Sequence, residues 1–197
     1  MSAVKRAVDI AGAALLLAAL LPLMLAVTLV VAVSSPGPPL FRQRRVGRAG
    51  REFGMWKFRT MVVEAERLRP LLIGDSRDAD WLDLERDPRV TRTGRVLRRT
   101  SLDELPQLLN VLLGDMSLVG PRPLPLEEHA RIPEWAAART DVRPGITGLW
   151  QVRGRAALGF VDMLHLDCEY AREATLWVDL KILVRTVPAV LAAKGAK

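Results

Sequence analysis

The sequence predicts a mainly α-helical protein with little β-structure, in which an N-terminal membrane helix is joined to a compact, helix-rich domain. Residues 10–33 contain no charged side chain, although 26% of the whole chain is charged. Beyond residue 40, apolar residues recur at helical spacing, and the alternation typical of strands is scarce. We therefore predict a membrane segment at residues 1–40 and a soluble domain at 41–197.

Composition narrows the class of protein. A chain of 197 residues with 50% hydrophobic content has room for one domain and is neither disordered nor polytopic. The net charge of +7 favours an anionic partner: a nucleic acid, a lipid surface or a phosphorylated substrate. The single cysteine, Cys168, excludes an intrachain disulfide, and two histidines leave little room for a histidine metal site.

The apolar segment at 10–33 is long enough to cross a bilayer, for which about 20 residues suffice. A cleaved signal peptide is an alternative, because Lys5 and Arg6 would form its basic N-terminal region. The run is longer than a typical signal core, however, and no clear cleavage site precedes Pro36. We favour a retained membrane anchor.

Pro22 lies near the middle of this segment and predicts a kink or a break, because proline lacks the backbone donor. Both flanks are basic, with Lys5 and Arg6 before the segment and several arginines from Arg42 onward. One straight crossing cannot place both flanks on the cytoplasmic side. Physical reasoning leaves two alternatives open, a kinked single-pass helix and a re-entrant helix that returns to the side from which it entered.

Three later segments have recognisable patterns. Residues 42–59 are strongly basic, as expected of a patch beside anionic headgroups. Residues 61–72 and 95–113 have helical spacing. Residues 176–191 place their large apolar side chains on one helical face, which predicts either an interfacial amphipathic helix or a helix packed on the core.

The segment around Asp103 and Glu104 is the strongest candidate for chemistry. Ser101 followed by Glu104 also matches a capping box, a purely structural role. In the catalytic alternative, an ionised carboxylate attacks phosphorus, a divalent cation offsets the negative charges, and Arg98 and Arg122 hold phosphate oxygens. No Walker A loop, dinucleotide fingerprint, nucleophile elbow or nucleic-acid-binding module is present, so we expect no nucleic-acid partner.

Taken together, the motifs resemble those of the bacterial sugar transferases, monotopic phosphoglycosyl transferases that act on polyprenol phosphate. They occur in order along nearly the whole chain: Lys5-Arg6 with Asp9, Phe41-Arg42-Gln43, Arg45-Val46-Gly47, Lys57-Phe58-Arg59-Thr60-Met61, Asp87-Pro88-Arg89-Val90-Thr91, Ser101-Leu102-Asp103-Glu104-Leu105-Pro106-Gln107, Asp115-Met116-Ser117, Gly120-Pro121-Arg122-Pro123, Pro144-Gly145-Ile146-Thr147-Gly148, Gln151-Val152 and Asp179-Leu180-Lys181.

The resemblance implies a two-step reaction in which Asp103 is the covalent nucleophile. A UDP-sugar would leave its phosphosugar on the enzyme and release UMP, and polyprenol phosphate would then accept the phosphosugar. This is the first step of a bacterial glycoconjugate or exopolysaccharide pathway. Glu104 would bind Mg²⁺ together with Asp103 or handle a proton. The expected phosphate contacts are Lys57, Arg98, Arg122 and Arg155.

The resemblance also favours the re-entrant helix, broken at Pro22, and a location on the cytoplasmic face of the bacterial inner membrane, in contact with membrane lipid. Small family members often carry Ser-Pro at the break, where this chain has Leu21 and Pro22. The chain resembles the minimal catalytic unit, and the sequence leaves a homodimer open. A membrane-tethered scaffold or nucleic-acid-binding protein would explain the anchor or the charge, but not the carboxylate pair.

Overall fold

The computed structural model describes residues 2–76, 82, 84, 86–154 and 158–192, and it confirms a mainly helical chain with a few short strands. The α-helices are α1 (Ala3–Ser34), α2 (Ala65–Leu68), α3 (Arg92–Arg99), α4 (Gln107–Leu113), α5 (Leu126–His129), α6 (Leu149–Arg153), α7 (Phe160–Glu173) and α8 (Leu176–Leu191). Short 3₁₀ helices are η1 (Arg48–Gly50), η2 (Arg69–Asp75), η3 (Leu102–Glu104) and η4 (Glu134–Thr140), and the strands are β1 (Leu40–Val46), β2 (Glu52–Phe58), β3 (Ser117–Val119) and β4 (Gly145–Thr147).

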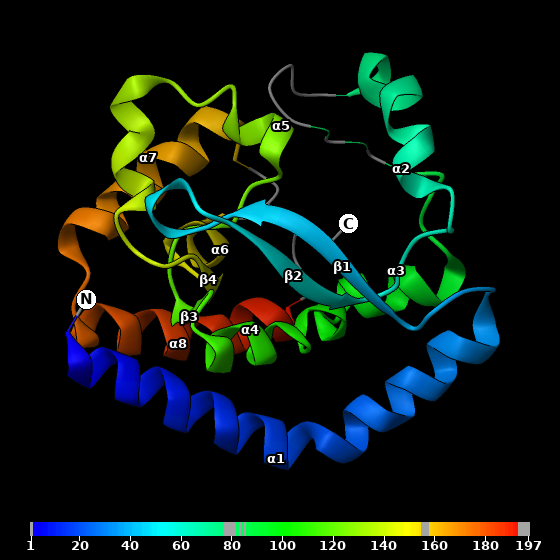
Figure 1. The fold of residues 1–197 in the computed structure, drawn as a ribbon, viewed down its shortest axis with the longest axis horizontal. Coiled ribbons are helices and arrows are strands. Elements are labelled where there is room, and N and C mark those ends of the chain that lie inside the picture. Colours follow the sequence, from blue (N-terminus) through cyan, green and yellow to red (C-terminus); the bar gives the residue numbers. More distant parts are fainter. Residues whose placement is uncertain (1, 77–81, 83, 85, 155–157, 193–197) are drawn as a thin grey trace.

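Helix α1 is one continuous helix that bends near its middle, with its concave side toward the rest of the protein (Figure 1). The Ser2 side chain caps its start by accepting a hydrogen bond from the Lys5 amide at 3.2 Å. Pro22 lies inside the helix. Because proline has no N–H, one hydrogen bond of the helix is missing there, which accounts for a bend. The structure therefore has the predicted kink at Pro22 without a break in the helix.

Both halves of α1 pack on the same domain. In the first half, Ala13 joins a core cluster with residues of α4 and β3. In the second half, Val27 and Val31 pack against Phe58 and Leu97. The opposite face is apolar and open, with side chains such as Leu15 and Val33 more than 70% exposed. By length and composition α1 could cross a membrane, and its outer face has no cover from the described part of the chain.

The basic segment at 42–59 is an antiparallel hairpin, β1–β2, with Arg42 paired to Trp56. The expectation of a simple basic patch with few strands missed this hairpin, because exposed arginines obscure the alternation along β1. The free edge of β2 is completed by a side chain: Asn110 of α4 accepts from the Trp56 amide at 2.9 Å and donates to the Gly54 carbonyl at 2.8 Å. The hairpin is thereby fixed against α4.

The predicted helical region at 95–113 is two helices, α3 and α4, separated by the turn η3. Ser101 has φ 56°, a left-handed conformation that ends α3 and turns the chain. The region at 61–72 is likewise shorter than predicted as an α-helix and continues as 3₁₀ helix η2. The turn between α3 and α4 places the carboxylate pair at the junction of two helices.

Strands β3 and β4 pair in parallel, and Gly145 of β4 lies against the backbone of Gly120, the residue that follows β3. A Cβ at Gly145 would lie 2.0 Å from the Gly120 amide nitrogen, so only glycine fits there. The main core lies around these strands and contains Met55, Leu108, Val111, Met116, Tyr170 and Ile182. Strand β3 leads directly into the Pro121-Arg122-Pro123 segment.

Helix α8 spans Leu176–Leu191, as the sequence predicts. Of the predicted apolar face, Leu176, Leu180, Val184 and Val187 are exposed, as expected of an interfacial helix, whereas Leu183 is partly buried against the main core. The other face packs inward through Ile182 and Asp179. The Lys181 ammonium lies 5.2 Å from the centre of the exposed Trp177 ring.

Candidate active site

Asp103 and Glu104 lie in η3, at the turn before α4. The structural alternative of a capping box is not formed, because the Ser101 side chain makes no cap hydrogen bond and its backbone is left-handed. Asp103 is 6% exposed and Glu104 is half-buried. A buried carboxylate in a strained turn, without a role in capping, is typical of a functional position.

Lys57, on β2, holds the carboxylate pair. Its Nζ lies 2.9 Å from Glu104 Oε1 and 3.8 Å from Asp103 Oδ2. The hairpin, fixed by Asn110, therefore places one ammonium group between the two carboxylates. The sequence separates this lysine from the pair by more than 40 residues, and the structure brings the three together.

Burial raises the pKa of Asp103 to about 6, against the opposing charges of Lys57 and Arg98, and the charge of Glu104 acts in the same direction as burial. A carboxylate with such a pKa is still mostly ionised at pH 7 but is poorly solvated. Because the ionised form lacks the full solvation of water, it is more reactive toward an electrophile than an exposed aspartate.

The other predicted phosphate contacts have different positions. Arg98 donates from Nε to Thr60 Oγ1 at 3.0 Å, and its charge acts on Asp103. Arg122 follows β3 and lines a pocket together with Lys57 and Glu104. Arg155 lies outside the residues that the structure describes. The structure therefore gathers Lys57, Arg98 and Arg122 around the carboxylate pair.

This pocket has further polar walls that the sequence did not single out. It encloses about 240 Å³, including the part open to solvent, and its polar lining is Arg45, Lys57, Glu104, Gln107, Arg122 and Gln151. Three of these six side chains are cationic, so the pocket suits an anion. Arg45 and Gln151 appear in the recognised motifs, but their chemical role depends on long-range packing that the sequence does not reveal.

Arg45 is a buried cation at this wall, 8% exposed. Its Nη1 donates to the Pro123 carbonyl at 3.0 Å, and its Nε and Nη2 donate to Gln43 Oε1. Burial, together with the nearby charge of Arg122, lowers the pKa of Arg45 to about 9. A buried arginine next to a second arginine is stabilised when an anion binds between them.

Arg122 is held through its main chain and its side chain. The Arg122 amide donates to Asp167 Oδ1 at 3.4 Å, and the Arg122 carbonyl accepts from Arg139 Nη2. Arg139 and Asp167 are themselves a fully buried ion pair at 2.6 Å. The Arg122 guanidinium lies 5.0 Å from the centre of the Trp150 ring. These contacts fix the orientation of the Arg122 side chain relative to the backbone.

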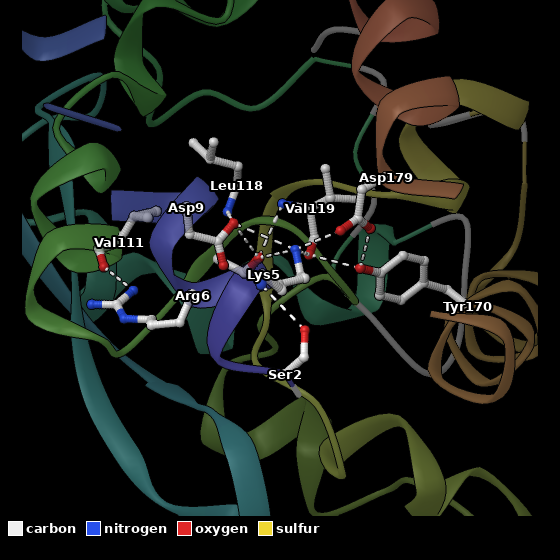
Figure 2. A network of polar contacts seen from close by, with 10 residues as sticks. Ser2, Lys5, Arg6, Asp9, Val111, Leu118, Val119, Tyr170 and Asp179 are labelled. Carbon is white, nitrogen blue, oxygen red and sulfur yellow. Dashed lines mark hydrogen bonds and ion pairs between the residues drawn. The ribbon is translucent and has the colours of Figure 1, made fainter. Parts of the chain in front are cut away.

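A buried polar network connects the start of α1 to β3 and α8 (Figure 2). Lys5 Nζ lies 2.7 Å from Asp179 Oδ2 and donates to Ser117 Oγ at 2.8 Å. Asp9 Oδ1 accepts from the Leu118 amide, and the Tyr170 hydroxyl donates to Asp179 Oδ1 at 2.6 Å. The network gives two charged residues near the start of the largely apolar α1, Lys5 and Asp9, buried partners, and it ties that helix to the strand that precedes Arg122.

The other end of α1 is held by Arg59. Its Nη2 donates to the Val31 and Ser35 carbonyls at 3.1 and 2.7 Å, and its Nη1 donates to the Pro38 carbonyl. Carbonyls in the last turn of a helix lack the amide partners that the helix interior supplies, and Arg59 donates to two of them, those of Val31 and Ser35. Both ends of α1 are therefore attached to one folded domain.

The carboxylate pair fits Mg²⁺ by its donor chemistry. Mg²⁺ is usually held by one or two carboxylates, with waters and substrate phosphates completing its shell. Among the described residues no group of three or more His, Cys, Asp or Glu side chains could hold a metal by itself. Asp103 and Glu104 offer the two carboxylates that such a phosphate-shared ion needs from the protein.

Comparison with known proteins agrees with the motifs along the chain. The Bacterial sugar transferase family matches residues 1–193. A galactosyl transferase, CpsE, of Streptococcus agalactiae is 43% identical over 98% of this chain and 43% of its own length. A UDP-glucose:undecaprenyl-phosphate glucose-1-phosphate transferase of Caulobacter vibrioides is 46% identical over 98% of this chain and 71% of its own length. An undecaprenyl-phosphate galactose phosphotransferase of Salmonella typhimurium is 42% identical over 98% of this chain and 41% of its own length.

The chain thus spans less than half the length of the Streptococcus and Salmonella relatives and about 70% of the Caulobacter one. The similarity covers α1, the carboxylate pair and α8 alike, since the family match begins at residue 1 and ends at residue 193. The chain belongs to the bacterial sugar transferase family.

Proposed function

We propose that this protein transfers a sugar phosphate from a UDP-sugar to membrane-bound undecaprenyl phosphate, the first step in assembling a bacterial exopolysaccharide or glycoconjugate. The names of the relatives support this chemistry, since two of them are undecaprenyl-phosphate sugar-phosphate transferases. The observation that carries it is the buried Asp103, placed with Glu104 against Lys57 beside a cationic pocket.

In the first step Asp103 attacks the β-phosphorus of the UDP-sugar. A bond forms between Asp103 Oδ and phosphorus, the bond to the bridging oxygen breaks, and UMP leaves with the electron pair. Arg122 and Lys57 are the groups best placed to hold the nonbridging oxygens, because both line the pocket next to the carboxylates. Mg²⁺, when held by Asp103 and Glu104, neutralises phosphate charge.

In the second step an oxygen of undecaprenyl phosphate attacks the phosphorus of the Asp103 adduct. The carboxylate leaves, and polyprenyl-diphosphate-sugar is formed. The acceptor phosphate is ionised near neutral pH, so this step needs no general base. A shallow anchor suits the reaction, because the lipid phosphate lies at the headgroup plane and the donor is soluble.

We further propose that α1 enters the cytoplasmic leaflet of the inner membrane and returns. Support comes from the two attachments of this helix, Lys5 to Asp179 at one end and Arg59 to Ser35 at the other. Because both attachments are to one folded domain, both ends belong on the side of the membrane where that domain lies. The apolar outer face of α1 and the exposed face of α8 supply the surface for lipid.

Labelling tests the topology. Ser2→Cys and Leu40→Cys, each in a Cys168→Ala background, are treated with a membrane-impermeant maleimide in intact cells and in inverted vesicles. Both cysteines are expected to react only in inverted vesicles. Labelling of the two positions from opposite sides contradicts re-entry.

Kinetics tests the activity. The protein in detergent or nanodiscs, with Mg²⁺ and a panel of UDP-sugars, is expected to release UMP continuously only when undecaprenyl phosphate is present. Without acceptor, one donor is expected to give a burst of at most one UMP per enzyme. No UMP release from any donor in the presence of acceptor contradicts the proposed function.

A further inference from the structure

Gln151, on α6, is a buried polar residue in the wall of the candidate pocket, 9% exposed. Its Nε2 donates to the Ile146 carbonyl at 3.5 Å. Its Oε1 is buried and has no hydrogen-bond partner among the residues that the structure describes. A buried acceptor without a donor is unfavourable unless a ligand supplies one.

The orientation of the amide has a physical reason. The Ile146 carbonyl can only accept a hydrogen bond, so the NH₂ group of Gln151 is the end that belongs beside it. Oε1 then lies on the other side, next to Gly148. A Cβ at Gly148 would lie 2.9 Å from this oxygen, so the glycine leaves the space beside Oε1 free of a side chain.

The neighbours of Gln151 in the pocket set the ligand chemistry. Arg45, Lys57 and Arg122 are donors only, which suits phosphate oxygens. The Gln151 oxygen is an acceptor, and it would be repelled by those same phosphate oxygens. It therefore needs a ligand group that donates a hydrogen bond and lies within a few atoms of the bound phosphate.

The geometry points to Gln151 as a residue that recognises the sugar: its Oε1 accepts a hydrogen bond from a hydroxyl or amide N–H of the hexose on the transferred phosphate. This inference rests on the proposed function. A UDP-sugar has donors on the hexose, the ribose and the uracil, and those of the hexose lie nearest the transferred phosphorus. Undecaprenyl phosphate carries no hydroxyl beyond its phosphate.

The test pairs deoxy substrates with a variant that lacks the acceptor. UDP-glucose or UDP-galactose, whichever supports UMP release, is compared with its monodeoxy analogues at C2, C3, C4 and C6. The wild-type protein is expected to lose about 10- to 100-fold in kcat/KM with one of these analogues, because the Gln151 oxygen is left without a donor. Gln151→Leu is expected to lose a similar factor on the parent sugar but to be indifferent to that one deoxy change.

Gln107→Leu is the matched control, because Gln107 is also a buried glutamine of this pocket, 2% exposed. It is expected to keep the preference of the wild-type protein for the hydroxylated sugar. Gln151→Met serves as a second variant if Gln151→Leu does not fold, and the wild-type deoxy series needs no variant at all.

Three results overturn the inference while leaving the proposed function standing. The wild-type protein, active on the parent sugar, can be indifferent to every deoxy change. Gln151→Leu can lose the same factor on all donors, which indicates a structural role or a bound water. Gln151→Leu can also weaken Mg²⁺ binding without changing the deoxy preference, which indicates a metal ligand. Absence of UMP release from every donor would instead contradict the proposed function itself.

Discussion

Arg139 and Asp167 form a fully buried ion pair at 2.6 Å, and each of them also bonds the main chain of Arg122. Both side chains are 3% exposed or less. A buried pair of charges is costly to desolvate and seldom contributes much net stability. Its role here is better explained by position, because it fixes the amide and the carbonyl of one pocket arginine simultaneously.

The Arg139–Asp167 pair, which we call the clamp on Arg122, predicts a loss of activity that is separate from the loss of stability. Arg139→Met leaves Asp167 without its partner and is expected to destabilise the protein by about 3–5 kcal/mol. The double variant Arg139→Met with Asp167→Leu removes both charges and is expected to recover much of that stability. Its kcat/KM for the UDP-sugar is still expected to be reduced at least 10-fold, because Arg122 has lost both main-chain partners. Thermal unfolding and UMP-release kinetics measure the two effects, and recovery of activity along with stability would show that the pair is only structural.

The buried network around Lys5 predicts that replacing this lysine lowers the stability of the protein strongly. Lys5→Met leaves Asp9 and Asp179 buried without their shared cation, which is expected to cost about 3–5 kcal/mol. For a chain of this size the melting temperature is expected to fall by about 10 °C. Arg153→Met is the control, because it breaks an exposed ion pair with Glu169 and is expected to cost less than about 1 kcal/mol. Equal melting temperatures for the two variants would contradict a structural role of the network.

The raised pKa of Asp103 predicts how Mg²⁺ binding depends on pH. Protons and metal compete for the ionised carboxylate, so the affinity for Mg²⁺ is expected to fall about tenfold per pH unit below pH 6 and to level off above it. Lys57 lowers this pKa, so Lys57→Met is expected to move the fall to higher pH. Calorimetric titration with MgCl₂ at several pH values measures the effect, and an affinity that is constant between pH 5 and 7 would be inconsistent with a metal on Asp103.

The close packing at Gly145 predicts that the β3–β4 pair does not tolerate a side chain at this position. A Cβ at this position would meet the Gly120 backbone at 2.0 Å, so Gly145→Ala is expected to force the strands apart at a cost of about 1–3 kcal/mol. Because β3 leads into Arg122, UMP release is expected to fall as well. Gly74→Ala, where a Cβ meets nothing within 4 Å, is the control and is expected to change the melting temperature little. A melting temperature of Gly145→Ala equal to that of the wild-type protein would contradict the crowding.

The parts of the fold that local patterns determine could be predicted. The uncharged segment at 10–33 predicted helix α1, and the apolar face of residues 176–191 predicted helix α8. The hairpin was missed because arginines occupy positions along β1 where a strand pattern expects alternation, and its second edge is completed by Asn110 from another element. The continuity of α1 through Pro22 was missed because both of its halves are held by packing on the domain.

The residues of the candidate site likewise divide into those that local motifs predict and those that only the folded chain reveals. Asp103, Glu104 and Arg122 lie in short motifs whose chemistry can be recognised from neighbouring residues. The clamp could not be predicted, because Arg139 and Asp167 are 28 residues apart and neither belongs to a recognised motif. Lys5 and Ser117 are 112 residues apart, and only the folded chain shows that they form a hydrogen bond. Likewise, only the folded chain shows that Gln151 Oε1 is buried without a hydrogen-bond donor among the described residues.

The covalent step on Asp103 is the central claim, and intact-protein mass spectrometry tests it most directly. The protein is incubated with Mg²⁺ and the UDP-sugar that supports UMP release, without undecaprenyl phosphate, and is then quenched. The expected result is a mass increase of one phosphosugar that is absent in Asp103→Asn and disappears from the wild-type protein when undecaprenyl phosphate is added. An adduct of the same mass on Asp103→Asn, or full turnover by that variant, would contradict the account.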